Sequence, residues 1–118
     1  MNALRALSLC AVTFALAAPA AAGDAAAGAA KAKEVCAACH GADGNTPTTP
    51  DFPKLGGQRY DYLVHALKAY KSGARKNAIM AGQVEKLSRR ELEDLAAYYA
   101  EQHSTLHVIP LHRIAGGL

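Results

Sequence analysis

The chain has 118 residues, of which 13 are lysine or arginine and 10 are aspartate or glutamate, giving a formal net charge of +3. A chain of this length forms one small domain. Nucleic-acid binding calls for clustered and dominant positive charge, so this near-balanced composition argues against a nucleic-acid partner.

The N-terminus has the pattern of a signal peptide. A positively charged start containing Arg5 leads into an apolar stretch over residues 6–18, followed by small residues that end at Ala22. The apolar stretch is too short to span a bilayer, which disfavours the alternative of an uncleaved anchor. Cys10 is not preceded by the small residue that a lipoprotein signal places there, so lipid anchoring is not expected. We expect cleavage near Ala22, loss of Cys10 with the leader, and location in the periplasm.

The next predicted element is a helix over residues 24–35, in which Asp24 caps an alanine-rich run that leads into the pentapeptide CAACH. In a helical segment, positions i, i+3 and i+4 share one face, so Cys36, Cys39 and His40 point the same way. The two sulfurs can then form thioethers with the two vinyl groups of one porphyrin, while the imidazole reaches the iron. This spacing is the attachment pattern of a covalently bound haem c.

Other uses of two cysteines three positions apart fit this chain less well. A thioredoxin-like redox pair expects a βαβ context, and no β-rich run is nearby. A tetrahedral zinc site needs four ligands, and the chain has no second cysteine pair. A disulfide across two intervening residues would be strained and would close almost no loop. Haem attachment is therefore the prediction, with thiol redox chemistry and metal binding as the alternatives.

Residues 41–58 are rich in proline and glycine and form a loop whose length suggests that it wraps something. The helical pattern returns over residues 59–72, with an apolar stripe that includes Tyr70 and with Gly73 as the expected C-cap. His65 is in this helix but off the stripe, so we expect it to face solvent.

Residues 74–87 are expected to form a second loop, which holds Met80. An iron held by His40 has a sixth position to fill, and Met80 is the only methionine after Met1. Ligation from both faces of a haem requires a particular order along the chain: a histidine, a long loop, a helix, a second loop and then a methionine. The alternative is that Met80 fills a gap in the core. Four histidines are rival ligands, although none lies in a comparable loop: His65, His103, His107 and His112.

The last predicted helix runs to about residue 102 and opens with a capping box, in which Ser88 pairs with Glu91. No strand-period alternation is long enough to predict a sheet. The sequence therefore predicts an all-α fold, with three to four helices around one haem.

Taken in order, these segments resemble a known family. The matching pieces are CAACHG, FPKLGGQ, YLVHALKAYKSGAR, NAIM and LSRRELEDLAAYYA, which together cover about residues 24–102. The chain resembles a class I c-type cytochrome of the small, soluble bacterial kind with one haem. The resemblance implies that Gly28 lies where the first and last helices cross, against the Leu95–Tyr98 face, because a side chain at this position would block close approach.

The same resemblance implies which residues form the haem site. His40 and Met80 would be the axial ligands of the iron, and the motif cysteines would carry the haem through thioethers. The carbonyl of Pro53 would accept a hydrogen bond from His40 Nδ1, which fixes the imidazole tautomer. Leu55 would line the haem pocket.

These expectations together describe a periplasmic electron carrier that is not an enzyme. With both axial positions filled by the protein, no site is open to substrate, and one-electron exchange occurs through the exposed haem edge. The expected partners are redox protein donors and acceptors, such as membrane-bound respiratory or dehydrogenase complexes, and the carrier is expected to be a monomer. Two alternatives are the haem-bearing relay subunit of a larger oxidoreductase, and a sensor or peroxidase-like protein in which Met80 is displaced.

The expected division of the chain is a leader over residues 1–22, a cytochrome domain over 23–102 and a tail over 103–118. The tail departs from the family, whose domains usually end soon after the final helix. Its histidines suggest a metal site, but Pro110 and the paired glycines favour a flexible tail.

Five lysines flank the haem-binding segments and are either a steering surface for acidic partners or ordinary solvated side chains: Lys31, Lys33, Lys54, Lys76 and Lys86.

Overall fold

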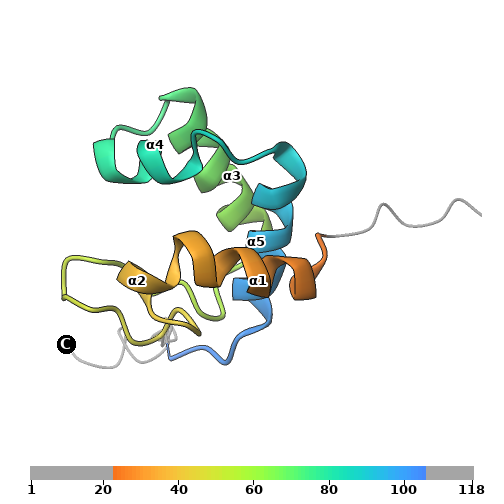
Figure 1. Cartoon of the computed structure of the whole chain (residues 1–118). Helices are drawn as coiled ribbons and strands as arrows, with labels where there is room; N and C mark the ends of the chain where they lie inside the picture. The colour runs from red at the N-terminus through yellow and green to blue at the C-terminus, as the bar shows by residue number, and fades with distance from the viewer. Residues whose placement is uncertain (1–22, 106–118) are drawn as a thin grey trace, which may run out of the picture.

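The computed structural model describes residues 23–105, and within that range it is built of helices without strands (Figure 1). The helices are α1 Ala25–Val35, α2 Ala37–His40, α3 Tyr60–Ser72, α4 Ala78–Val84 and α5 Arg89–Glu101. The predicted all-α fold is confirmed. No helix in the described part of the chain is long and apolar enough to cross a membrane.

Several sequence predictions fall outside the described residues. They are the signal peptide with its cleavage site at Ala22, the fate of Cys10, and the tail histidines His107 and His112.

In Figure 1, α3 and α4 lie above, α1, α2 and the long loop that follows α2 lie below, and α5 runs behind and joins the two parts. The core is continuous across these helices, because buried side chains from four of them pack together. The largest fully buried side chains are Leu92 and Leu95 of α5 and Val84 of α4. The core therefore joins α1, α3, α4 and α5 into one packed unit.

The crossing of α1 and α5 depends on Gly28, which is buried. A Cβ atom at this position would collide with the backbone carbonyl oxygen of Asp94 and would lie 2.9 Å from the Cβ of Tyr98. The close approach that the resemblance implied is present, and its contacts are Tyr98 of the expected face and Asp94 just before it. A residue with a side chain would force the two helix backbones apart.

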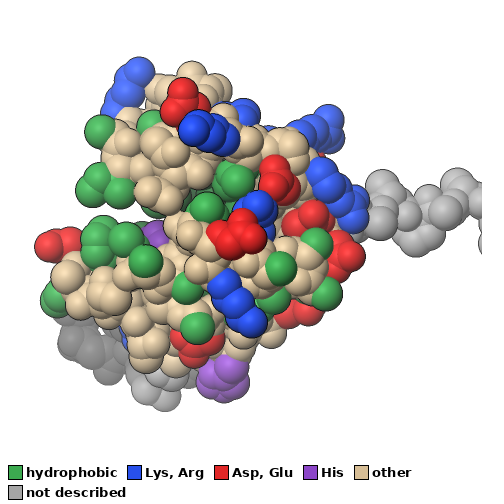
Figure 2. All heavy atoms as spheres, viewed as in Figure 1, with side chains coloured by type: hydrophobic (Ala, Val, Ile, Leu, Met, Phe, Trp, Pro, Cys, Tyr) green, Lys and Arg blue, Asp and Glu red, His purple; other side chains and the backbone are tan. Residues whose placement is uncertain are grey.

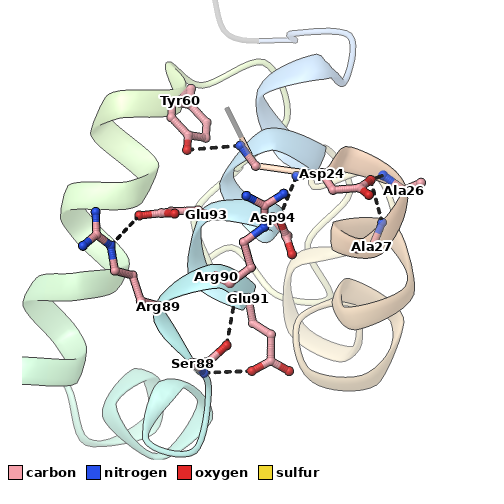
Figure 3. Close-up of polar contacts among 11 residues, drawn as sticks. Asp24, Ala26, Ala27, Tyr60, Ser88, Arg89, Arg90, Glu91, Glu93 and Asp94 are labelled. Atoms are coloured by element: carbon pink, nitrogen blue, oxygen red, sulfur yellow. Dashed lines mark hydrogen bonds and ion pairs between the residues drawn. The ribbon is translucent and has the colours of Figure 1, made fainter. Parts of the chain in front are cut away.

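The start of α1 is held by α5 through two aspartates (Figure 3). The Asp24 carboxylate accepts a hydrogen bond from the backbone N–H of Ala26 at 2.9 Å, so the predicted cap is present. The backbone N–H of Asp24 donates to Asp94 Oδ1 at 2.6 Å, and Arg90 pairs with the same oxygen at 3.0 Å. A buried carboxylate needs such partners, and Asp94 finds them by linking the start of α1 to the middle of α5.

The capping box at the start of α5 is confirmed (Figure 3). The Glu91 backbone N–H donates to Ser88 Oγ at 3.2 Å, and the Ser88 backbone N–H donates to Glu91 Oε2 at 2.8 Å. These bonds, together with Lys31 at 3.2 Å, lower the pKa of Glu91 to about 2.

The prediction for α3 is also confirmed, since Gly73 ends it with a left-handed φ of 76° and His65 is exposed.

The prediction of a loop over residues 74–87 is wrong in its centre, where α4 forms. Asn77 caps this helix, its side chain accepting a hydrogen bond from the backbone N–H of Met80 at 2.9 Å. Met80 therefore lies in the first turn of a helix, not in a loop. The seven residues of α4 cover less than two full helical periods, and Gly82 interrupts their apolar pattern. The pattern was therefore too short to predict a helix.

Candidate haem-binding site

A cavity of ≈ 320 Å³ opens between the upper and lower helices. Figure 2 shows its mouth as a cleft with hydrophobic side chains on both sides. The lining includes all six side chains predicted for the haem site: Cys36, Cys39, His40, Pro53, Leu55 and Met80. His65 and His103, the two rival histidines that the structure describes, do not line it.

The two motif cysteines follow α1, with Cys36 between α1 and α2 and Cys39 within α2. Cys36 adopts a right-handed helical backbone, and the backbone N–H of His40 donates to the Cys36 carbonyl at 3.0 Å. This bond joins positions i and i+4, as in the helix from which the haem-attachment motif was predicted. Neither cysteine of the motif is in a disulfide bond. Within residues 23–105, no cluster of three or more His, Cys, Asp or Glu side chains could hold a metal ion.

The environment of Cys36 differs from that of a redox-active thiol. Burial raises the pKa of Cys36 to about 11, although the nearby Tyr99 hydroxyl acts in the opposite direction. Nucleophilic cysteines of CxxC redox pairs have a lowered pKa, because the thiolate is the reactive form. The thioredoxin-like alternative is therefore disfavoured at this site.

His40 is buried, with 5% of its surface exposed, and its ring is fixed from one side. Its Nδ1 atom lies 2.8 Å from the carbonyl oxygen of Pro53, and the Phe52 ring meets it edge-on with the centroids 6.1 Å apart. A carbonyl oxygen only accepts hydrogen bonds, so the proton is on Nδ1 and the lone pair is on Nε2. This is the tautomer that a histidine needs to bind a metal through Nε2.

The loop that carries Pro53 is tied back to the rest of the fold by its own backbone. The Leu55 N–H donates to the Gly44 carbonyl at 2.8 Å, and the Gly57 N–H donates to the Tyr99 carbonyl at 2.9 Å. The Thr48 N–H reaches the Cys39 carbonyl at 3.0 Å. The loop is thus held against both the motif and α5, which places Leu55 in the cavity wall.

Asn45 is a buried residue of this loop whose importance the sequence analysis missed. Its Nδ2 donates to the His103 carbonyl at 2.8 Å, and its Oδ1 accepts from Thr105 Oγ1 at 3.1 Å. Lys54 Nζ donates to the same hydroxyl at 3.1 Å. The first residues after α5 are therefore bound to the loop that positions Pro53. Short polar side chains are common in loops, so the type and position of Asn45 alone gave no signal.

Met80 lines the cavity from α4 and packs against the core. It thus comes from the upper part of the fold, whereas His40 comes from the lower part. Arg75, which the sequence analysis also missed, lines the cavity and stacks over the Tyr70 ring at 4.8 Å. The donor set is one imidazole and one thioether around an apolar space, and two thiols are available for covalent attachment. These residues fit a haem c.

Comparisons with known proteins give the same result. Residues 25–101 match the family model described as cytochrome c. Cytochrome c4 of Pseudomonas aeruginosa is 48% identical over 97 residues, which are 82% of this chain and 47% of that protein. Cytochrome c-554(548) of Halomonas halodenitrificans is 45% identical over 70 residues, which are 57% of this chain and 83% of that protein.

Solved structures and other relatives extend this likeness. The structure of reduced recombinant cytochrome c4 from Pseudomonas stutzeri matches with a TM-score of 0.64 and 45% identity, over 70% of this chain and 47% of that one. A protein of Thiomonas intermedia named thiosulfate dehydrogenase electron acceptor is 39% identical over 66 residues, 56% of this chain and 30% of that protein. The chain spans about half the length of the cytochromes c4 that it matches. It belongs to the cytochrome c family and carries covalently attached haem c, for which Cys36 and Cys39 are in place.

Proposed function

We propose that this protein is an exported one-electron carrier whose haem iron is held between His40 and Met80. The observation that carries the proposal is that both side chains line one cavity from different helices, α2 and α4. The bond from His40 Nδ1 to Pro53 leaves Nε2 free to bind the iron. The thioether of Met80 is a neutral, soft ligand, which favours ferrous iron.

The haem supplies the reversible exchange of one electron when it is bound. The residues around the haem determine its electron affinity. Apolar side chains such as Leu63 and Leu95 line the cavity and limit contact with water, which disfavours the more charged oxidised state. With both axial positions taken by side chains, the iron has no place for a substrate, so the protein transfers electrons without being an enzyme.

Redox proteins would dock at the cavity mouth, where apolar groups are accessible. Tyr62 is 47% exposed and Ile79 is 58% exposed, and both line the cavity. Of the lysines predicted to steer partners, Lys31 is already paired with Glu34 and Glu91, so it is the least available. The other four lysines are exposed and would suit an acidic partner, and Lys54 among them lines the cavity: Lys33, Lys54, Lys76 and Lys86.

The rest of the proposal concerns the whole chain. A leader over residues 1–22 would direct the protein to the periplasm and be removed near Ala22. The cytochrome domain would cover residues 23–102 and the tail residues 103–118, and the carrier would act as a monomer. These proposals are supported by the leader pattern, by the position of the last helix, and by a fold that buries its own core.

A second candidate is a relay subunit that stays bound to a larger oxidoreductase. It is favoured by the relatives from Thiomonas intermedia and Stutzerimonas stutzeri whose names are thiosulfate dehydrogenase electron acceptor. Purification from the native host under mild conditions distinguishes the two candidates. A free carrier elutes at the mass of one chain, whereas a relay subunit co-elutes with a catalytic protein.

Absorption spectra of the oxidised and reduced protein test the carrier proposal. We expect c-type bands in the reduced form and, in the oxidised form, the weak long-wavelength band of a sulfur-ligated ferric haem. The reduced form should not bind carbon monoxide at neutral pH. Rapid binding of carbon monoxide would instead support the sensor or peroxidase-like alternative, in which Met80 is displaced.

A further inference from the structure

Tyr99 of α5 has a buried hydroxyl group that nothing described so far employs. Its side chain is 3% exposed, and among the described residues its Oη atom is a buried polar atom without a hydrogen-bond partner of regular geometry. Leaving a buried hydroxyl unpaired is costly, and phenylalanine would fill the same space without that cost. The position of Tyr99 in the cavity lining suggests that the hydroxyl has a role there.

The neighbouring tyrosine shows the contrast. Tyr98 Oη donates to the carbonyl oxygen of Ala42 at 2.8 Å, and its side chain is only half-buried. The two rings pack against each other with their centroids 5.0 Å apart. Two adjacent tyrosines thus differ in one respect that matters here. The hydroxyl of Tyr98 is satisfied by the backbone, whereas that of Tyr99 is buried and has no such partner.

Cys36 is partly buried against the core cluster that contains Tyr99, and both side chains line the same cavity. Burial raises the pKa of Tyr99 above its ordinary value, and the adjacent Cys36 raises it further. In return, hydrogen bonding from Tyr99 opposes the effect of burial on the pKa of Cys36. Both directions are those of a phenol that donates its proton towards sulfur. Asp43 acts on Tyr99 more weakly, and its carboxylate already accepts the Asn45 backbone N–H at 2.9 Å.

Haem attachment changes what this sulfur can do. As a thiol, Cys36 can donate or accept a hydrogen bond, but as a thioether it has no proton and can only accept. We propose that the Tyr99 hydroxyl donates a hydrogen bond to the thioether sulfur of Cys36 in the haem-loaded protein. This inference rests on the proposed function and adds to it a residue that tunes the electron affinity of the site.

The expected effect has a definite sign. A donor on the sulfur draws electron density away from the porphyrin edge to which that sulfur is bonded, so it favours the reduced state. Hydrogen bonds close to a haem are among the ways in which a protein sets its potential. The effect should be confined to one of the two attachment points, since Cys36 is the cysteine that acts on Tyr99.

The test compares Tyr99→Phe with the matched control Tyr98→Phe in the haem-loaded protein. We expect the midpoint potential to fall in Tyr99→Phe and to stay at the wild-type value in Tyr98→Phe. In NMR spectra, the thioether protons at Cys36 should shift in Tyr99→Phe while those at Cys39 do not. Equal potentials in the two variants, or equal shifts at both thioethers, would overturn the proposal.

The wild-type protein offers an independent measurement should Tyr99→Phe fold poorly. A hydroxyl proton held by the sulfur should exchange slowly with solvent and give a resolved NMR signal with a cross-peak to the β protons of Cys36. Absence of that signal in a well-folded sample contradicts the proposal. If the signal is absent but the c-type spectrum and the sulfur–iron band are present, the hydrogen bond is refuted and the carrier function is not. If the c-type spectrum itself is absent, the carrier function is refuted.

Discussion

The Nδ1 atom of His40 lies 2.8 Å from the carbonyl oxygen of Pro53, thirteen positions further along the chain. A backbone acceptor cannot be removed by changing a side chain, and it cannot be protonated in the ordinary pH range. The imidazole is therefore held in one tautomer, which leaves Nε2 free for the iron ligation that we propose. The loop that carries Pro53 is consequently part of the haem site, although it contributes no ligand of its own.

The first prediction concerns Met80 as the second axial ligand. Met80→Ala should abolish the long-wavelength sulfur–iron band, lower the midpoint potential and allow the ferrous form to bind carbon monoxide, because the soft thioether no longer occupies the sixth position. The control is Gly82→Ala, which changes an exposed position of the same helix outside the cavity lining, meets nothing within 4 Å and should leave all three properties unchanged. Spectra of the two oxidised variants give the answer, and an unaltered band in Met80→Ala would reject the assignment.

The second prediction concerns Asn45, which joins the loop to the segment after α5. Asn45→Ala removes its bonds to His103 and Thr105 and leaves buried polar groups without partners. We expect a loss of about 1–3 kcal/mol in the free energy of unfolding. Urea titration followed by the haem absorption measures this loss. Thr49→Ala, an exposed change in the same loop, should cost less than about 0.5 kcal/mol. Equal losses in the two variants would show that Asn45 is not an anchor.

The third prediction compares two helical glycines. Gly28→Ala places a methyl group against the backbone of Asp94, which cannot move without shifting α5, so it should destabilise the protein by about 1–3 kcal/mol or more. Gly82→Ala in α4 meets nothing within 4 Å and should be neutral or stabilising by about 0.5–1 kcal/mol. Thermal unfolding of the two variants tests the contrast. A Gly28→Ala protein as stable as the wild type would mean that the helix crossing tolerates separation.

The features that the sequence predicted well depend on residues close together in the chain. The CAACH motif, the Ser88 capping box and the Gly73 C-cap each lie within a few positions, so spacing alone defines their geometry. The contact between Gly28 and α5 came from the family resemblance. The fold brings all the predicted site residues to one cavity. The helix that carries Met80 was not predicted, because α4 is short.

The features that were missed depend on distant partners. Asn45 bonds to His103, 58 positions away, and Tyr99 interacts with Cys36 from the other end of the domain. An asparagine in a loop and a tyrosine on a helical stripe have common structural explanations. Only the folded chain shows that one links two segments and that the other has a buried hydroxyl beside the cavity.

The fourth prediction concerns covalent attachment. Acidified organic solvent should leave the colour with the wild-type polypeptide, because both thiols are bonded to the porphyrin. Cys36→Ala and Cys39→Ala should each retain one thioether or fail to mature, and the double variant should release all of its haem. Mass spectrometry of the intact chain checks the result, since attachment adds the mass of one haem. Release of free haem from the wild-type protein would rule out covalent attachment.

The fifth prediction follows from Glu91, whose pKa is lowered to about 2 by its bonds to Ser88 and by Lys31. In the unfolded chain a glutamate has a pKa of about 4.3. The ionised carboxylate therefore stabilises the fold fully above the unfolded pKa, and this contribution is lost as the pH falls from about 5 towards 2. Glu91→Gln removes the charge, so the difference in Tm between wild type and variant should be constant above about pH 5 and shrink below it.

Far-UV circular dichroism melts at intervals between pH 2 and pH 7 measure that difference without relying on the haem spectrum. Glu101→Gln is a matched control, because it removes an exposed charge at the other end of α5 without touching the capping box. The control should follow the wild-type Tm in parallel at every pH. A Tm difference for Glu91→Gln that is the same at pH 3 and pH 7 would mean that Glu91 acts through its shape and hydrogen bonding and not through its charge.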